Sequence, residues 1–95
     1  MSYGQAIATV QQENDRVRVT EWRFPPGTAT GHHVHEYDYV VVPILGGTLT
    51  IAEDDGTRNP SPIVTGRSYA RGRGVSHDVI NETDAEICFI EVEIK

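Results

Sequence analysis

The chain has 95 residues, of which 14 are acidic and 8 are Lys or Arg, so its net charge is -6. This length suits one domain, residues 1–95, with a modest hydrophobic core. The acidic balance argues against a nucleic-acid partner and against an anionic membrane surface. No apolar run reaches the ~18 residues that a membrane span needs. The first residues also lack the basic start and apolar stretch of a signal peptide, so a cytoplasmic location is expected.

Short strand-like segments recur along the chain, and turn residues separate them. Residues 16–24 alternate between polar and apolar side chains and are rich in β-branched and aromatic types, which is typical of a strand. No segment carries a sustained helical stripe. The pattern therefore predicts an all-β sandwich or barrel. The expected strands are residues 6–10, 16–24, 37–42, 48–52, 63–65, 68–70, 75–80 and 85–94.

Two details of the middle of the chain can be predicted. Residues 37–42 and 48–52 flank Gly46 and Gly47, and we expect them to pair as a hairpin. The turn-rich segment 53–62 is expected to form an exposed loop rather than a site.

The last predicted strand, 85–94, is expected to leave the core. One of its faces carries Cys88, Ile90, Val92 and Ile94, whereas the other begins apolar and ends with two glutamates. Cys88 is the single cysteine, and its apolar neighbours indicate an inert, buried thiol.

Histidines carry the clearest chemical signal. His33 and His35 are separated by one residue, so on an extended strand both imidazoles lie on the same side of the backbone. His77 lies in a second strand-like run, and we expect the fold to bring it to the pair. Imidazole nitrogen suits Zn, Fe, Ni, Mn or Cu, and three such ligands leave coordination positions for water or substrate. The alternative for a lone His-x-His pair is two solvent-facing side chains beside a loop.

Two stretches of the sequence resemble the two motifs of the cupin superfamily. The first motif, Gly-x5-His-x-His-x3-4-Glu-x6-Gly, is matched by Gly27, His33, His35 and Gly46, with Tyr39 in place of the glutamate. The second, Gly-x5-Pro-x-Gly-x2-His-x3-Asn, is matched by Gly66, Gly74, His77 and Asn81, with Gly72 in place of the proline. The resemblance implies a small single-domain cupin jelly-roll barrel, with His33, His35 and His77 as ligands of a divalent transition metal: Fe, Mn, Ni or Zn.

In that barrel, strand parity assigns side chains to faces. Asn81 would lie on the inner face with His77 and Val79, and Tyr37 and Tyr39 would point inward with the histidine pair. His32 would lie on the other face, as a surface residue or a partner of a ligand.

Tyr39 is the most informative departure from the family pattern. As a neutral phenol it could hydrogen-bond a metal-bound water or a substrate, which makes it the candidate catalytic residue, although a plain aromatic core residue is an equal alternative. Glu36 and Asp38 have the opposite parity, so either could supply a fourth ligand only if a bulge rotated it inward.

The resemblance also implies classes of function. A three-histidine site keeps a formal charge of +2 and so favours a small anionic metabolite. The precedent of three-histidine cupins suggests a dioxygenase if the metal is iron, and isomerase or lyase chemistry if it is Mn, Zn or Ni. The alternative is a non-catalytic module that binds a small ligand or a metal.

Other features of the sequence bear on the ligand and the assembly. Arg23, Arg71 and Arg73 could hold a substrate carboxylate, with solvated loop or edge positions as the alternative. The run from His35 to Pro43 is similar to small bacterial cupins associated with β-alanine degradation, which suggests a carboxylate or amino-acid-like ligand. Trp22 and Phe24 share a strand face and are expected in the core. Small cupins commonly pair by their outer sheets, so a homodimer is expected.

Overall fold

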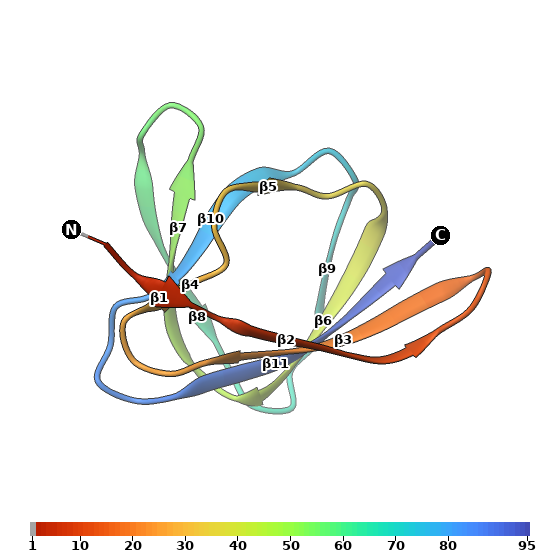
Figure 1. Ribbon diagram of the computed structural model, residues 1–95, viewed down its shortest axis with the longest axis horizontal. Helices are drawn as coiled ribbons and strands as arrows, with labels where there is room; N and C mark the ends of the chain where they lie inside the picture. Colours follow the sequence, from red (N-terminus) through yellow and green to blue (C-terminus); the bar gives the residue numbers. More distant parts are fainter. Residues whose placement is uncertain (1) are drawn as a thin grey trace.

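Two β-sheets pack face to face in the computed structural model, which describes residues 2–95 (Figure 1). The first sheet has the order β1-β4-β10-β7-β8, and β5 pairs with β10 beside this path. Its strands are β1 (Gly4–Gln5), β4 (Thr28–Ala29), β5 (His33–Val34), β7 (Gly47–Glu53), β8 (Arg58–Ile63) and β10 (Ser76–Asn81). The second sheet has the order β2-β3-β11-β6-β9, with β2 (Ile7–Glu13), β3 (Val17–Phe24), β6 (Asp38–Leu45), β9 (Tyr69–Arg71) and β11 (Ile87–Ile94).

The core lies between the two sheets and confirms the all-β prediction. Alternate side chains of each strand point inward, as the period of a strand requires. Phe24 of β3 and Phe89 of β11 meet with ring centroids 5.5 Å apart, and Leu49 and Ile87 are almost fully buried beside them. Cys88 is fully buried, as expected, and burial raises the pKa of its thiol. The part of the chain that the structure describes contains no helix long and apolar enough to cross a membrane.

The predicted hairpin between residues 37–42 and 48–52 is wrong. β6 belongs to the second sheet and β7 to the first, so the chain changes sheets at Gly46. A Cβ atom on Gly46 would lie 2.7 Å from the Ile63 carbonyl oxygen and 2.9 Å from the Thr65 nitrogen. The glycine therefore marks a close backbone crossing rather than a tight turn. Alternation predicts a strand correctly, but it does not identify the partner of that strand.

The prediction of an exposed loop over residues 53–62 is also wrong in its second half. β8 begins at Arg58 and pairs with β7, and it contains Pro60 and Pro62. Proline argued against a strand in the sequence, but β8 is the edge of its sheet, where a missing N–H donor is tolerated. The strands predicted at 63–65 and 68–70 are displaced, since β8 ends at Ile63 and β9 covers Tyr69–Arg71.

The acidic end of the last strand does not leave the core. Glu91 and Glu93 are only 8% and 7% exposed, and they continue the inward face that begins with Ile87. Arg18 of β3 makes this possible: its Nε and Nη2 atoms donate to the two Glu93 carboxylate oxygens at 2.7 and 3.0 Å. A bidentate pair of this kind offsets part of the cost of burying the charge.

Candidate metal centre

The register of the first sheet brings the two histidine segments together. His77 of β10 lies directly opposite His33 of β5. His35 follows β5, and its backbone is fixed against the residues before β10. Its N–H donates to the Val75 carbonyl at 2.9 Å, and its carbonyl accepts from the Gly74 N–H at 2.8 Å. Strand pairing and these two backbone hydrogen bonds thus place the three imidazoles side by side.

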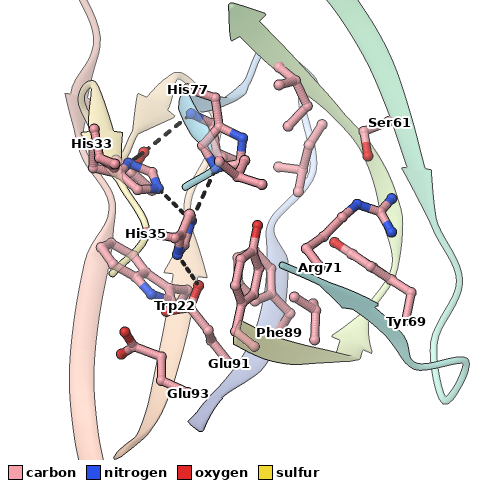
Figure 2. Close-up of a pocket in the computed structure, with 18 of the residues that line it drawn as sticks. Trp22, His33, His35, Ser61, Tyr69, Arg71, His77, Phe89, Glu91 and Glu93 are labelled. Atoms are coloured by element: carbon pink, nitrogen blue, oxygen red, sulfur yellow. Dashed lines mark hydrogen bonds and ion pairs between the residues drawn. The ribbon is translucent and has the colours of Figure 1, made fainter. Parts of the chain in front are cut away.

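The three imidazoles converge through their Nε2 atoms (Figure 2). The His35 Nε2 atom lies 3.1 Å from that of His33 and 3.2 Å from that of His77. All three ligand atoms lie within 4.8 Å of one another. Among residues 2–95 this is the one cluster of histidine, cysteine or carboxylate side chains with such spacing.

Hydrogen bonding defines the tautomer of His33. Its Nδ1 atom lies 2.8 Å from the Gly31 carbonyl oxygen, which can only accept, so Nδ1 carries the proton. In this tautomer the Nε2 atom presents its lone pair to the cluster. A partner of this kind on the outer nitrogen is what orients metal-binding histidines.

Burial keeps the other two rings neutral. Burial first, and the neighbouring His33 second, lower the pKa of His35 to about 4 and that of His77 to about 4. At neutral pH both rings therefore hold a free lone pair. Converging lone pairs repel one another unless a cation or a proton lies between them. The donor set is thus compatible with a divalent transition metal, for which neutral imidazoles are ordinary ligands.

Tyr39 lies against this cluster. Its ring stacks on His35 with centroids 4.0 Å apart and an interplanar angle of 19°. The residue is 4% exposed and belongs to the core, yet it also lines the adjoining pocket. Burial raises its pKa to about 12, so the phenol keeps its proton at neutral pH. It can therefore donate a hydrogen bond into the pocket, but it is poorly suited to ligate as phenolate.

The segment between β5 and β6 explains why the side-chain directions predicted from strand alternation are partly wrong. β5 ends at Val34 and β6 begins at Asp38, so strand alternation does not hold across the intervening residues. Glu36 lines the pocket although its parity excluded it, whereas Tyr37, predicted to point inward, does not. Asp38 is exposed, and its Oδ1 accepts from the Arg73 N–H at 2.9 Å.

The structure also shows where Asn81, Val79 and His32 lie. Asn81 is fully buried and makes hydrogen bonds to backbone groups of neighbouring segments, while Val79 lines the pocket. His32 is exposed, and its Nε2 atom contacts both Asp54 Oδ1 at 2.6 Å and Ser76 Oγ at 3.0 Å. Both contacts use one nitrogen, so the imidazole cannot relay a proton from serine to aspartate in the manner of a catalytic triad.

A pocket of about 560 Å³ opens beside the histidines, between the two sheets. Several of the residues that line it could not be predicted from the sequence, because burial at these positions depends on pairing between distant strands. Of the three arginines proposed for a carboxylate, only Arg71 lines it. Arg23 instead pairs with Glu86 at 3.0 Å. The lining residues not anticipated are Arg18, Asn59, Pro60, Ser61, Glu91 and Glu93, together with Trp22, which was expected in the core.

Glu91 extends the polar environment to the outer side of His35. One carboxylate oxygen lies 3.9 Å from His35 Nδ1, which is too long for a direct hydrogen bond (Figure 2). The contact is not an ion pair at neutral pH, since burial keeps His35 uncharged. Burial and the nearby Glu93 carboxylate raise the pKa of Glu91 from 4.5 to about 7.

The raised pKa predicts that Glu91→Gln stabilises the metal-free protein at alkaline pH. The folded state holds the Glu91 proton more tightly than the unfolded state, so wild-type stability falls as pH rises from 4.5 through about 7. The variant should unfold with about 2–3 kcal/mol more free energy than wild type near pH 8. This gain should vanish at about pH 3, below both pKa values, where the side chain is protonated in the folded and the unfolded state. Urea unfolding after EDTA treatment at both pH values measures it, and an equal gain at both would contradict the prediction.

Comparisons with known proteins agree with this architecture. A family model described as "Cupin domain" matches residues 20–93. The chain is 52% identical over 91 residues to the Pseudomonas aeruginosa protein named "Beta-alanine degradation protein BauB", covering 96% of this chain and 95% of that one. A crystal structure of a cupin domain from Bordetella pertussis superposes with a TM-score of 0.95 at 52% identity, covering 100% of this chain and 98% of the other. A Klebsiella pneumoniae protein with a double-stranded β-helix domain superposes with a TM-score of 0.77 at 22% identity, covering 99% of this chain and 80% of the other.

Proposed function

The chain belongs to the cupin family, and from this membership and the converging histidines we propose that it is a metal-dependent enzyme acting on a small anionic metabolite. The observation that carries the proposal is the approach of three Nε2 atoms at the wall of a pocket that is large enough for a small molecule. His33, His35 and His77 would hold the metal. The cytoplasmic location expected from the sequence stays a prediction.

A divalent metal bound there supplies Lewis-acid chemistry, and redox chemistry if it is iron. The residues of the chain contribute the remaining functions. The Tyr39 phenol, neutral because of its raised pKa, can hold a proton toward a substrate oxygen beside His35. Val41, Leu49 and Phe89 form an apolar lining that excludes water from the reacting end of the ligand.

The charge of the donor set favours an anion. Three neutral imidazoles leave the formal charge of a divalent ion at +2, whereas a carboxylate ligand would have reduced it. The name of the Pseudomonas aeruginosa relative points the same way, because β-alanine carries a carboxylate. We therefore place carboxylic and amino acids first among candidate substrates.

Elemental analysis of the protein purified without an affinity tag tests the proposal, because a polyhistidine column can load nickel into such a site. We expect about one equivalent of Fe, Mn, Ni or Zn per chain. Oxygen consumption with a panel of carboxylic acids then tests the iron case, and product analysis tests isomerase or lyase chemistry. A protein that neither carries a metal nor takes one up on titration would contradict the proposal. A tightly held metal without turnover would instead support a non-catalytic binding module.

We also propose a homodimer, because the outer face of the second sheet carries an uncovered apolar patch. Three neighbouring strands, β3, β11 and β6, present it, with Val92 opposite both Val19 and Val40. Glu21, Arg23 and Asp38 share this face, so the apolar side chains form a patch within it. An apolar patch on adjacent strands is typical of an interaction surface. The half-buried or exposed apolar residues of this face are Val17, Val19, Val40, Val42, Ile90, Val92 and Ile94.

Light scattering after size exclusion should give twice the mass of the 10.5 kDa chain at micromolar concentration. Val92→Glu, at the centre of the face, should give a monomer because the interface would bury a charge without a partner. Thr48→Glu, an exposed position on the first sheet, is the matched control and should stay dimeric. A wild-type monomer would refute the proposal.

A further inference from the structure

Arg71 is placed by its strand register on the inner face of the second sheet. It lies directly opposite Tyr39 in the antiparallel pair of β6 and β9. Residues opposite one another in such a pair share a face, with Cβ atoms about 4.5–5.5 Å apart. Tyr39 in turn stacks on His35 at 4.0 Å. One side chain therefore separates the guanidinium-bearing residue from the histidine cluster.

The surroundings of Arg71 hold it in place without neutralising it. Its guanidinium lies 4.7 Å above the Tyr69 ring, and its Nη1 atom donates to the Ala70 carbonyl at 3.0 Å. No carboxylate within residues 2–95 lies within ion-pair distance of it, in contrast to Arg18, Arg23 and Arg58. A stacked guanidinium with donors left over is well suited to bind a planar anion.

The pocket has two dissimilar polar ends. The histidines lie on one side of it, and Ser61, Tyr69 and Arg71 lie on the other, with Phe89 between them (Figure 2). The second end is formed where the edge strands β8 and β9 of the two sheets face the pocket. Four glutamates line the pocket. Glu93 is already bound by Arg18, Glu91 lies beside His35 at the histidine end, and Glu36 and Glu53 are exposed and in contact with solvent.

We propose that Arg71 is the specificity-determining residue of the site and binds a carboxylate at the end of the ligand remote from the histidines. The ligand is then bifunctional: one polar group is directed to the histidine cluster, a short apolar chain crosses Phe89, and a second group, the carboxylate, pairs with the guanidinium. This inference rests on the proposed function and specifies its substrate class as acids with a second oxygen- or nitrogen-bearing end.

Succinate and its monoamide, succinamate, provide the test because they differ only in whether the second end is charged. Calorimetric titration of the zinc-loaded protein should show succinate binding about 10-fold or more tightly than succinamate, as expected for a charge-assisted bidentate contact. Arg71→Gln should reduce this preference to less than about 2-fold, while Arg71→Lys should retain part of it. Arg73→Gln is the matched control, because Arg73 does not line the pocket, and it should retain the full preference.

The same titrations separate this inference from the proposed function. Zinc affinity is measured first for each variant and should be unchanged by Arg71→Gln. If wild type binds no zinc, the proposed function fails, and the metal-free protein is then titrated with succinate and with its neutral diamide, succinamide. A preference for succinate that disappears in Arg71→Gln still supports the role of Arg71. A wild type without preference for succinate in either form would overturn the inference, and so would an Arg71→Gln variant that keeps the preference.

Discussion

Replacing His77 with alanine is expected to abolish specific metal binding while leaving the protein folded. Loss of an outer partner of a ligand already costs about 10–100-fold in metal affinity, so loss of a ligand should cost more than ~100-fold. The protein should still fold, because His77 lies near the start of β10 and the buried Val79 and Ile80 anchor that strand. Competition titration with a zinc-sensitive dye, together with circular dichroism, measures both quantities.

His32→Ala is the control for this experiment. It removes an imidazole from the same segment, but His32 is exposed and engaged with Asp54 and Ser76 outside the cluster. Its zinc affinity should match that of wild type. If His32→Ala weakened zinc binding as much as His77→Ala, the converging histidines would not be the metal site.

The histidine cluster could be predicted from the sequence because its spacing rules are local. His33 and His35 required only the alternation of an extended chain, and the second motif supplied His77. Alternation alone could not predict the register that sets His77 opposite His33. That part of the prediction rested on the family resemblance. The buried thiol of Cys88 was likewise predictable, since its neighbours in sequence are apolar.

The rest of the pocket could not be predicted, because it depends on which strands become edges and which become partners. Pro60 and Pro62 suggested a loop, but an edge strand tolerates them, and the adjoining Asn59 and Ser61 line the pocket. Glu91 and Glu93 suggested a strand end in solvent. Both are buried, and Glu93 pairs with Arg18, some 75 positions away in sequence, on the neighbouring strand.

The assignment of strands to the two sheets could not be predicted from the sequence either. The apolar alternation of β6 and β7 is the same whether they pair with each other or lie in opposite sheets. At the change of sheet, Gly46 lies close to the backbone of Ile63 and Thr65. Such a contact between distant segments leaves no local pattern in the sequence.

Asn81→Ala should destabilise the fold more than any exposed substitution in the chain. The Asn81 amide Nδ2 donates to the Phe24 carbonyl at 2.9 Å and to the Ala85 carbonyl at 2.8 Å. Its Oδ1 accepts from Thr83 N at 3.0 Å and from Thr83 Oγ1 at 2.7 Å. One fully buried side chain thus ties the end of β3 to the turn between β10 and β11.

Alanine would remove the donor to the buried Phe24 carbonyl and the acceptor for Thr83, for which about 2–4 kcal/mol of unfolding free energy is expected. For a domain of this size that corresponds to a fall in Tm of more than about 10 °C. Asn81→Asp isolates the donor half of the network, because it keeps the acceptor for Thr83 but sets a carboxylate oxygen against the two carbonyls. It should be at least as damaging as alanine at neutral pH, and less so near pH 4, where protonation restores one donor. Thermal unfolding that leaves Asn81→Ala within about 2 °C of wild type would show that the motif asparagine is dispensable for stability.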